Sequence, residues 1–154
     1  MNSKIINNIN NVIMENDILW HLGDFAMGNR SLVPDLRKRI VCKNIHILWG
    51  NHDGQIQKQF SHLFNSTGNY AELRINNTLV TMMHFPIASW SEIGRGGINL
   101  HGHSHGRYPP VGRQKDVGMD CNNFMPLNLE HLVADMIKLP IVEVDGHTKH
   151  TSYK

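Results

Sequence analysis

Three histidines alternate with small residues in the segment Leu100-His101-Gly102-His103-Ser104-His105-Gly106. Side chains two positions apart on an extended chain point to the same side, so His103 and His105 can face one ligand. Gly102 and Gly106 allow other backbone to approach closely. Neutral imidazole is the commonest metal ligand in proteins. The segment therefore predicts a metal site, with a histidine-rich surface loop as the alternative.

Polar residues also follow three apolar runs that are typical of buried strands. The runs cover residues 18–20, 45–49 and 78–84. They lead into Asp24, into Asn51-His52-Asp53 and into His84 itself. Because ligands bind where the strands of α/β folds end, these groups and the histidine segment can share one site. Taken singly, Asp24 also fits a turn cap, and His84 fits an ordinary half-buried histidine.

Helical and extended patterns alternate along the chain. Apolar residues at helical spacing predict helices over residues 5–13, 32–41, 55–63 and 129–137. Short apolar runs predict strands over residues 18–20, 45–49, 70–75, 78–84, 98–100, 116–120 and 140–144. Ser31 and Asn128 are expected to cap helices, and Asn76-Asn77 to form a tight hairpin turn, because Asn tolerates positive φ. The alternation indicates a layered α/β fold.

The chain has 154 residues, 40% of them hydrophobic and 18% charged, which fits one soluble domain over 1–154 with a flexible polar tail over 146–154. The net charge of +2 is too small to favour nucleic acid or an anionic membrane as a partner. No apolar run approaches the roughly 20 residues needed to cross a bilayer, and no signal peptide is visible. Cys42 and Cys121 are expected to be reduced thiols of a cytoplasmic protein, with a disulfide between them as the alternative.

The order of these motifs resembles the calcineurin-like metallophosphoesterase family. Gly23-Asp24, Gly50-Asn51-His52-Asp53, an isolated His84 and Gly102-His103-Ser104-His105 carry the resemblance, which covers nearly the whole chain. The segments 21–25 and 117–120 also resemble the small bacterial and phage-type members of the family. The resemblance implies an αββα sandwich of two sheets flanked by helices.

The resemblance also implies a role for each matched residue in a two-metal centre. In this centre Asp24 bridges two divalent ions. The other ligands of one ion are Asn51, His84 and His103, and His105 binds the other ion. Carboxylate, amide and imidazole ligands suit Mn, Fe, Ni or Zn. Two such ions about 3.5–4 Å apart can share a hydroxide nucleophile and neutralise the charge that develops on a phosphate.

The predicted reaction is hydrolysis of a phosphoester by metal-bound hydroxide, with a diester favoured over a monoester. By resemblance, His52 faces the leaving group and donates a proton to it, while Asp53 orients His52 and keeps it charged. Asn51 and His52 are expected to contact the substrate, which is a small molecule or nucleotide-like. Arg95 is a further candidate contact for the phosphate, with a plain exposed loop arginine as the alternative.

The chain departs from the family at its beginning. The family opens with a strand that ends in Asp-x-His, and no such motif precedes Asp24. One strand is therefore expected to be missing. Of the ligands that the family gives the second ion, only Asp24 and His105 are expected to remain. Met1 is therefore expected to be an internal start of a longer protein. A second explanation supplies the pair from Asp145-Gly146-His147, and a third is a one-metal or inactive relative.

Two further expectations follow from the missing strand. The unpaired sheet edge invites another chain, which predicts a homodimer or strand exchange. The alternative function is a non-catalytic module that binds a partner protein. A nucleic-acid-binding role ranks below both, because Arg37-Lys38-Arg39 is the one short basic run.

Overall fold

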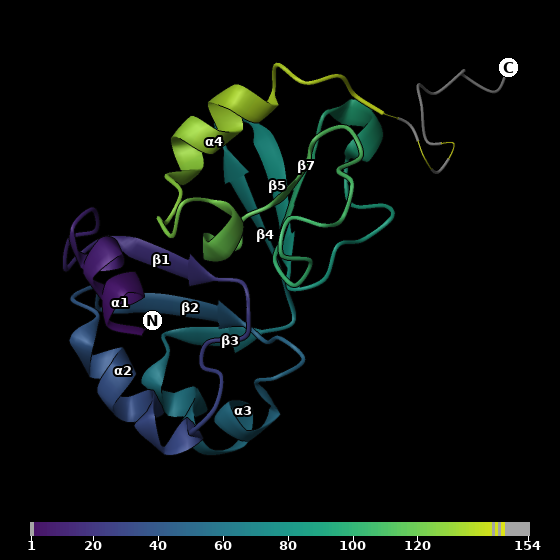
Figure 1. Ribbon diagram of the computed structural model, residues 1–154. Helices are drawn as coiled ribbons and strands as arrows, with labels where there is room; N and C mark the ends of the chain where they lie inside the picture. The colour runs from purple at the N-terminus through teal and green to yellow at the C-terminus, as the bar shows by residue number, and fades with distance from the viewer. Residues whose placement is uncertain (1, 143, 145, 147–154) are drawn as a thin grey trace, which may run out of the picture.

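Two β-sheets pack face to face in the computed structural model, which describes residues 2–142, 144 and 146 (Figure 1). The first sheet is parallel and has the order β1 (Ile18–His21), β2 (Asn44–Leu48), β3 (Ser66–Gly68). The second has the order β4 (Tyr70–Ile75), β5 (Thr78–Met83), β6 (Ile98–His101), β7 (Gln114–Asp116). Its β4 and β5 form an antiparallel hairpin, and its other pairs are parallel. The predicted α/β sandwich is therefore confirmed.

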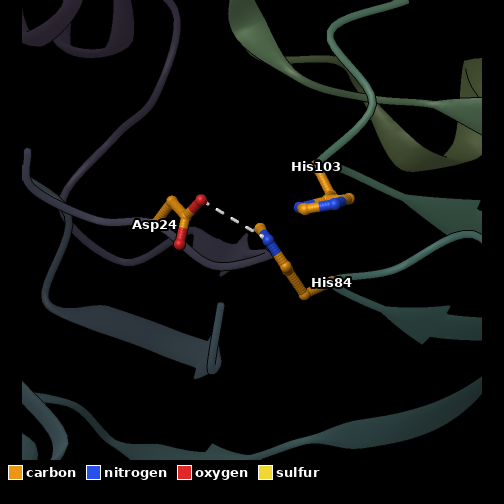
Figure 2. Close-up of side chains that lie close together, drawn as sticks. All are labelled: Asp24, His84 and His103. Atoms are coloured by element: carbon orange, nitrogen blue, oxygen red, sulfur yellow. Dashed lines mark ion pairs between the residues drawn. The ribbon is translucent and has the colours of Figure 1, made fainter. Parts of the chain in front are cut away.

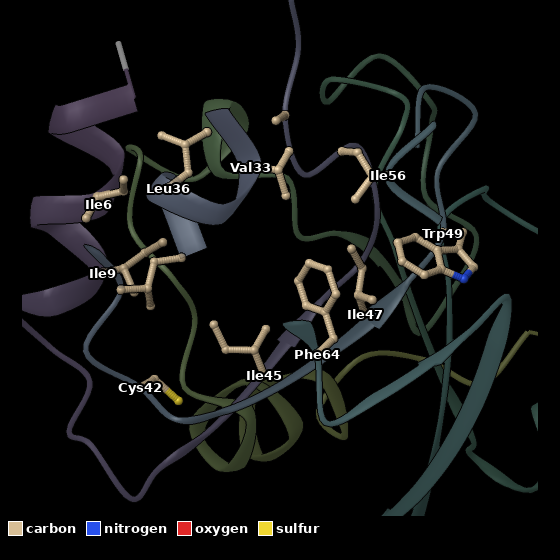
Figure 3. Close-up of a cluster of buried hydrophobic side chains, with 12 residues drawn as sticks. Ile6, Ile9, Val33, Leu36, Cys42, Ile45, Ile47, Trp49, Ile56 and Phe64 are labelled. Atoms are coloured by element: carbon tan, nitrogen blue, oxygen red, sulfur yellow. The ribbon is translucent and has the colours of Figure 1, made fainter. Parts of the chain in front are cut away.

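Three helices cover the outer face of the first sheet. They are α1 (Asn2–Asn10), α2 (Val33–Arg39) and α3 (Gly54–Phe60). Their apolar side chains, such as Ile6, Leu36 and Ile56, pack with Ile45 and Ile47 of β2 into one buried cluster (Figure 3). Because strand side chains alternate between faces, Ile45 and Ile47 share this face of the sheet.

A second buried cluster fills the space between the two sheets. Leu48 from the first sheet meets side chains of β5 and β6, including Met82 and Leu100. Helix α4 (Leu129–Met136) closes this core with Val133 and Met136. The Asn128 side chain caps α4, as expected, by accepting a hydrogen bond from the backbone N–H of His131 at 3.0 Å.

The parallel pairing fixes where the functional loops lie. β1 and β2 run side by side, so the loops after His21 and Leu48 leave from one edge of the first sheet. β5 and β6 are also parallel, so the segments after Met83 and His101 leave from one edge of the second. The predicted hairpin turn before β5 is confirmed, since Asn76 and Asn77 both have positive φ.

Two predicted strands are wrong, and one strand of the structure was not predicted. β3 was not expected, because Ser66-Thr67-Gly68 lacks an apolar run and depends on pairing with β2. β7 lies at Gln114–Asp116 rather than 116–120, where Met119–Cys121 forms a 3-10 turn. The described residues 140–142 are not a strand; Ile141 and Val142 instead pack beside Gly96 and Gly112.

Several smaller expectations have mixed outcomes. The N-cap is Asn29 rather than Ser31, since Asn29 accepts the Ser31 N–H and opens a 3-10 turn before α2. Cys42 and Cys121 are both free thiols. No helix in the described ranges is long and apolar enough to cross a membrane. Asp145, His147 and the tail residues 147–154 lie outside the described residues.

Candidate metal centre

Four side chains from four different segments converge at the edge where the two sheets meet. Asp24 follows β1, Asn51 follows β2, His84 follows β5 and His103 follows β6. The ligand atoms of Asp24, His84 and His103 all lie within 4.8 Å of one another (Figure 2). Asn51 Oδ1 lies 3.0 Å from His84 Nε2 and 3.0 Å from His103 Nδ1. The structure therefore brings together the four residues predicted to bind one ion.

The chemistry of this group fits a divalent cation. The buried His84 ring donates its Nδ1 hydrogen to the Leu22 carbonyl at 2.7 Å, which leaves the Nε2 lone pair facing the cluster. Nε2 then faces two acceptors, Asn51 Oδ1 and, at 3.5 Å, Asp24 Oδ2. Acceptor atoms gathered in this way need a positive charge between them. One carboxylate, one amide and two imidazoles are a ligand set that suits Mn, Fe, Ni or Zn.

Two glycines allow the segments to come this close. A Cβ atom on Gly23 would lie 2.4 Å from His84 Nδ1 and 2.6 Å from the Gly50 nitrogen. A Cβ atom on Gly50 would lie 2.2 Å from the Asp24 carboxylate. These distances are too short for any larger residue, so the glycines before Asp24 and Asn51 are needed for the convergence itself.

A buried carboxylate ties the first two loops to each other. Asp53 is 0% exposed and accepts hydrogen bonds from the backbone N–H groups of Asp24 at 2.6 Å, Phe25 at 2.9 Å and Gly50 at 2.8 Å. Asp24 has a φ of 56°, a conformation that costs energy for a residue other than glycine. The three hydrogen bonds hold Asp24 in that conformation and aim its side chain at the cluster.

The hydrogen bonds of Asp53 differ from the contact with His52 that the resemblance implies, which stays a prediction. Within the described ranges, no hydrogen bond joins its carboxylate to the His52 imidazole, because both of its oxygens are taken by backbone N–H groups. His52 is exposed and is fixed through its main chain, whose N–H donates to Asp24 Oδ1 at 2.9 Å. The exposed imidazole therefore lies on the loop beside the cluster, on the side open to solvent.

Two other predicted residues lie outside the cluster. The His105 side chain is 67% exposed, and its Nδ1 lies 2.5 Å from Asp120 Oδ2. Arg95 lies before β6 whereas His103 follows it, so about 10 Å of strand separates them. Arg95 is therefore not among the side chains that the structure gathers at the cluster, and its contact with phosphate stays a prediction.

His21 is a neighbour of the cluster that sequence reasoning missed. Its Nδ1 is buried without a hydrogen-bond partner. Burial lowers the pKa of His21, and the nearby carboxylates of Asp53 and Asp24 oppose this only in part. Its position in the sequence could have indicated that it lies beside the cluster. It stands directly before Leu22-Gly23-Asp24, in the segment 21–25 that resembles small members of the family.

Comparisons with known proteins find chains that are similar in sequence and in fold. A family model described as calcineurin-like phosphoesterase matches residues 2–154. An uncharacterized protein of Methanocaldococcus jannaschii is 27% identical over 151 residues, which is 92% of this chain and 78% of that protein. A crystal structure of a protein of unknown function from Aquifex aeolicus is similar with a TM-score of 0.63 at 18% identity. That similarity covers 82% of this chain and 80% of the other, and it supports the fold alone.

The Asp53 contacts lead to a stability prediction. Asp53→Ala removes the buried acceptor of three half-buried backbone N–H groups, and a donor left unpaired inside a protein costs about 1–3 kcal/mol. We therefore expect the free energy of unfolding to fall by at least about 3 kcal/mol, measured by urea denaturation. The matched control, Asp135→Ala, removes an exposed ion pair with Lys138 and should leave the free energy of unfolding nearly unchanged. Equal losses in the two variants would contradict the role assigned to Asp53.

Proposed function

The chain belongs to the calcineurin-like phosphoesterase family and is a metal-dependent phosphoesterase in that general sense. From this premise we propose that it is a phosphodiesterase. Its active site would be the group of Asp24, Asn51, His84 and His103, called the Asp24 cluster below. The observation that carries the proposal is the position of Asn51 Oδ1, 3.0 Å from both His84 Nε2 and His103 Nδ1. Four ligands remote in the sequence meet there. Asn51 and His103 are exposed, so a phosphate can reach the cluster from solvent.

Asp24, Asn51, His84 and His103 would hold the cation. When bound, a divalent ion supplies positive charge to the phosphate oxygens and makes a water molecule more acidic. The chain's own contribution is to fix the ligand atoms before the ion arrives. The Leu22 carbonyl sets the tautomer and orientation of His84, and Asp53 sets the backbone of Asp24.

His52 is proposed as the general acid. Its main chain is fixed by the hydrogen bond to Asp24 Oδ1, and its imidazole is exposed beside the cluster. A protonated imidazole there can donate a proton to the departing alkoxide oxygen, which leaves as an alcohol. Among the described residues, no carboxylate forms an ion pair with the His52 imidazole, so the proton donor is not held by a neighbouring acid.

A diester fits the charges beside the cluster better than a monoester. Arg30 reaches the His52 carbonyl at 3.4 Å and is the cationic side chain that contacts this loop among the described residues. A diester carries one negative charge and a monoester up to two, so the diester needs fewer fixed cations. We propose manganese as the ion, in keeping with the mixed oxygen and nitrogen ligands.

Activity tests this function directly. Protein loaded with Mn²⁺ should hydrolyse bis-p-nitrophenyl phosphate and a dinucleotide, and His52→Ala should lower kcat by about 10²–10⁴-fold because the leaving oxygen loses its proton donor. The loss should be larger for the dinucleotide, whose leaving group is an alkoxide. His131→Ala, which changes a histidine on α4, is the control and should keep full activity. No turnover by the wild type with Mn, Fe, Ni or Zn would contradict the proposal and favour a non-catalytic module.

The number of ions is a second prediction. From the described part of the chain, the second position of the family would take Asp24 and His105, and His105 already pairs with Asp120. Two protein ligands hold an ion poorly, so we expect close to one tightly bound Mn²⁺ per chain by isothermal titration calorimetry. His84→Ala should abolish that binding, while the surface control His131→Ala should not. Two equally tight sites would show that further ligands complete the second position.

We also propose that two copies pair through β1. This strand lies at the edge of its sheet in the described part of the chain, and Ile18 on it is 64% exposed. An open edge offers unpaired backbone groups to another strand. Light scattering should give a dimer mass at micromolar concentration, and Ile18→Lys should shift it to monomer. Leu139→Lys changes an exposed apolar residue of the segment after α4 and should not. A monomeric wild type would contradict this arrangement.

A further inference from the structure

The turn from His103 to Gly106 has an unusual backbone. His103, His105 and Gly106 have φ values of 64°, 51° and 71°. Positive φ is unfavourable for residues other than glycine, and this short turn contains two such histidines. Strained backbone of this kind persists only where the surrounding structure holds it. The turn carries His103, so whatever holds it also determines where that imidazole points.

Asp116 holds the turn from the neighbouring strand. Its Oδ2 accepts hydrogen bonds from Ser104 Oγ at 2.6 Å and from the Gly106 N–H at 2.9 Å. Its Oδ1 accepts from the Gly118 N–H at 2.8 Å. One carboxylate therefore connects the middle of the turn, its end and the segment that follows β7.

The sheet in turn fixes Asp116. It is the last residue of β7 and pairs with His101, and the N–H of Val117 donates to the His101 carbonyl at 2.8 Å. The carboxylate thus projects from hydrogen-bonded strand rather than from a free loop. A contact made from such a position can hold the turn in one conformation.

Asp116 keeps its negative charge among neutral donors. Burial by itself would raise the pKa of Asp116, but the hydrogen bonds from Ser104, Gly106 and Gly118 outweigh burial and lower it. Among the described residues, no lysine, arginine or histidine forms an ion pair with it. The carboxylate therefore serves the turn and the backbone of Gly118 rather than a partner cation.

We propose that Asp116 is a positioning residue for the metal centre, and that its hydrogen bonds to Ser104 and Gly106 hold His103 in the orientation that binds the ion. The inference rests on the proposed function, because it assumes that the Asp24 cluster binds a cation. It assigns Asp116 a role on the second sheet that matches the role of Asp53 on the first. Neither carboxylate is one of the ligands.

Metal affinity tests this role without using catalysis. Asp116→Asn keeps the size of the side chain but removes the charge and turns one acceptor into a donor that faces Ser104 or Gly106. We expect the Kd for Mn²⁺, titrated alone by calorimetry, to rise about 10–100-fold, the usual effect of losing a group that orients a ligand. The visible absorption bands of the Co²⁺-loaded protein should also shift, since they report ligand geometry. Asp135→Asn makes the same charge change on the exposed face of α4 and should alter neither readout.

A second variant covers the case in which Asp116→Asn does not fold. Ser104→Ala removes one of the three hydrogen bonds and leaves the carboxylate charged, so it should raise the Kd by a smaller factor of about 3–10. Circular dichroism and thermal unfolding identify which variants are native. If Asp116→Asn is native and keeps the wild-type Mn²⁺ affinity and Co²⁺ spectrum, the inference is overturned. If Asp116→Asn does not fold, the same result for Ser104→Ala overturns it. Absence of Mn²⁺ binding by the wild type would instead overturn the proposed function.

Discussion

The candidate centre depends on one buried carboxylate that joins two loops of different strands. Asp53 has no solvent exposure, and its two oxygens accept N–H groups from residues 24, 25 and 50. A buried carboxylate is costly unless it is fully hydrogen-bonded, so this contact forms only when both loops are in place. The loop after β1 and the loop after β2 are therefore fixed as a unit. Asp24 and Asn51 take their positions relative to each other from that unit.

The second sheet supplies the remaining ligands under similar constraints. His84 is held by the Leu22 carbonyl of the first loop, so the two sheets are connected at the centre by a hydrogen bond as well as by the apolar core. Gly23 and Gly50 make this approach sterically allowed. Positive φ at Asp24 and His103 places strain at two of the four candidate ligands. Such strain is typical of functional sites and is offset by the well-packed structure around them.

Much of this arrangement could be predicted from the sequence, because apolar runs followed by polar groups indicate the strand ends on which α/β sites are built. That pattern located Asp24, Asn51, His84 and His103, which the structure brings together. It could not reveal Asp53 as a support for Asp24, since the hydrogen bonds involved are to backbone groups 28 and 29 positions away. The bounds of β7 were misplaced for a related reason. Short loops and short edge strands are determined by tertiary contacts, and local sequence carries little signal for them.

The central claim is that Asp24, Asn51, His84 and His103 surround a single cation, and anomalous diffraction from crystals soaked in Mn²⁺ tests it most directly. The account predicts one strong peak that lies about 2.0–2.3 Å from a carboxylate oxygen of Asp24, Asn51 Oδ1, His84 Nε2 and His103 Nδ1. A map with no peak among these atoms, or with the main peak at other residues, would contradict it.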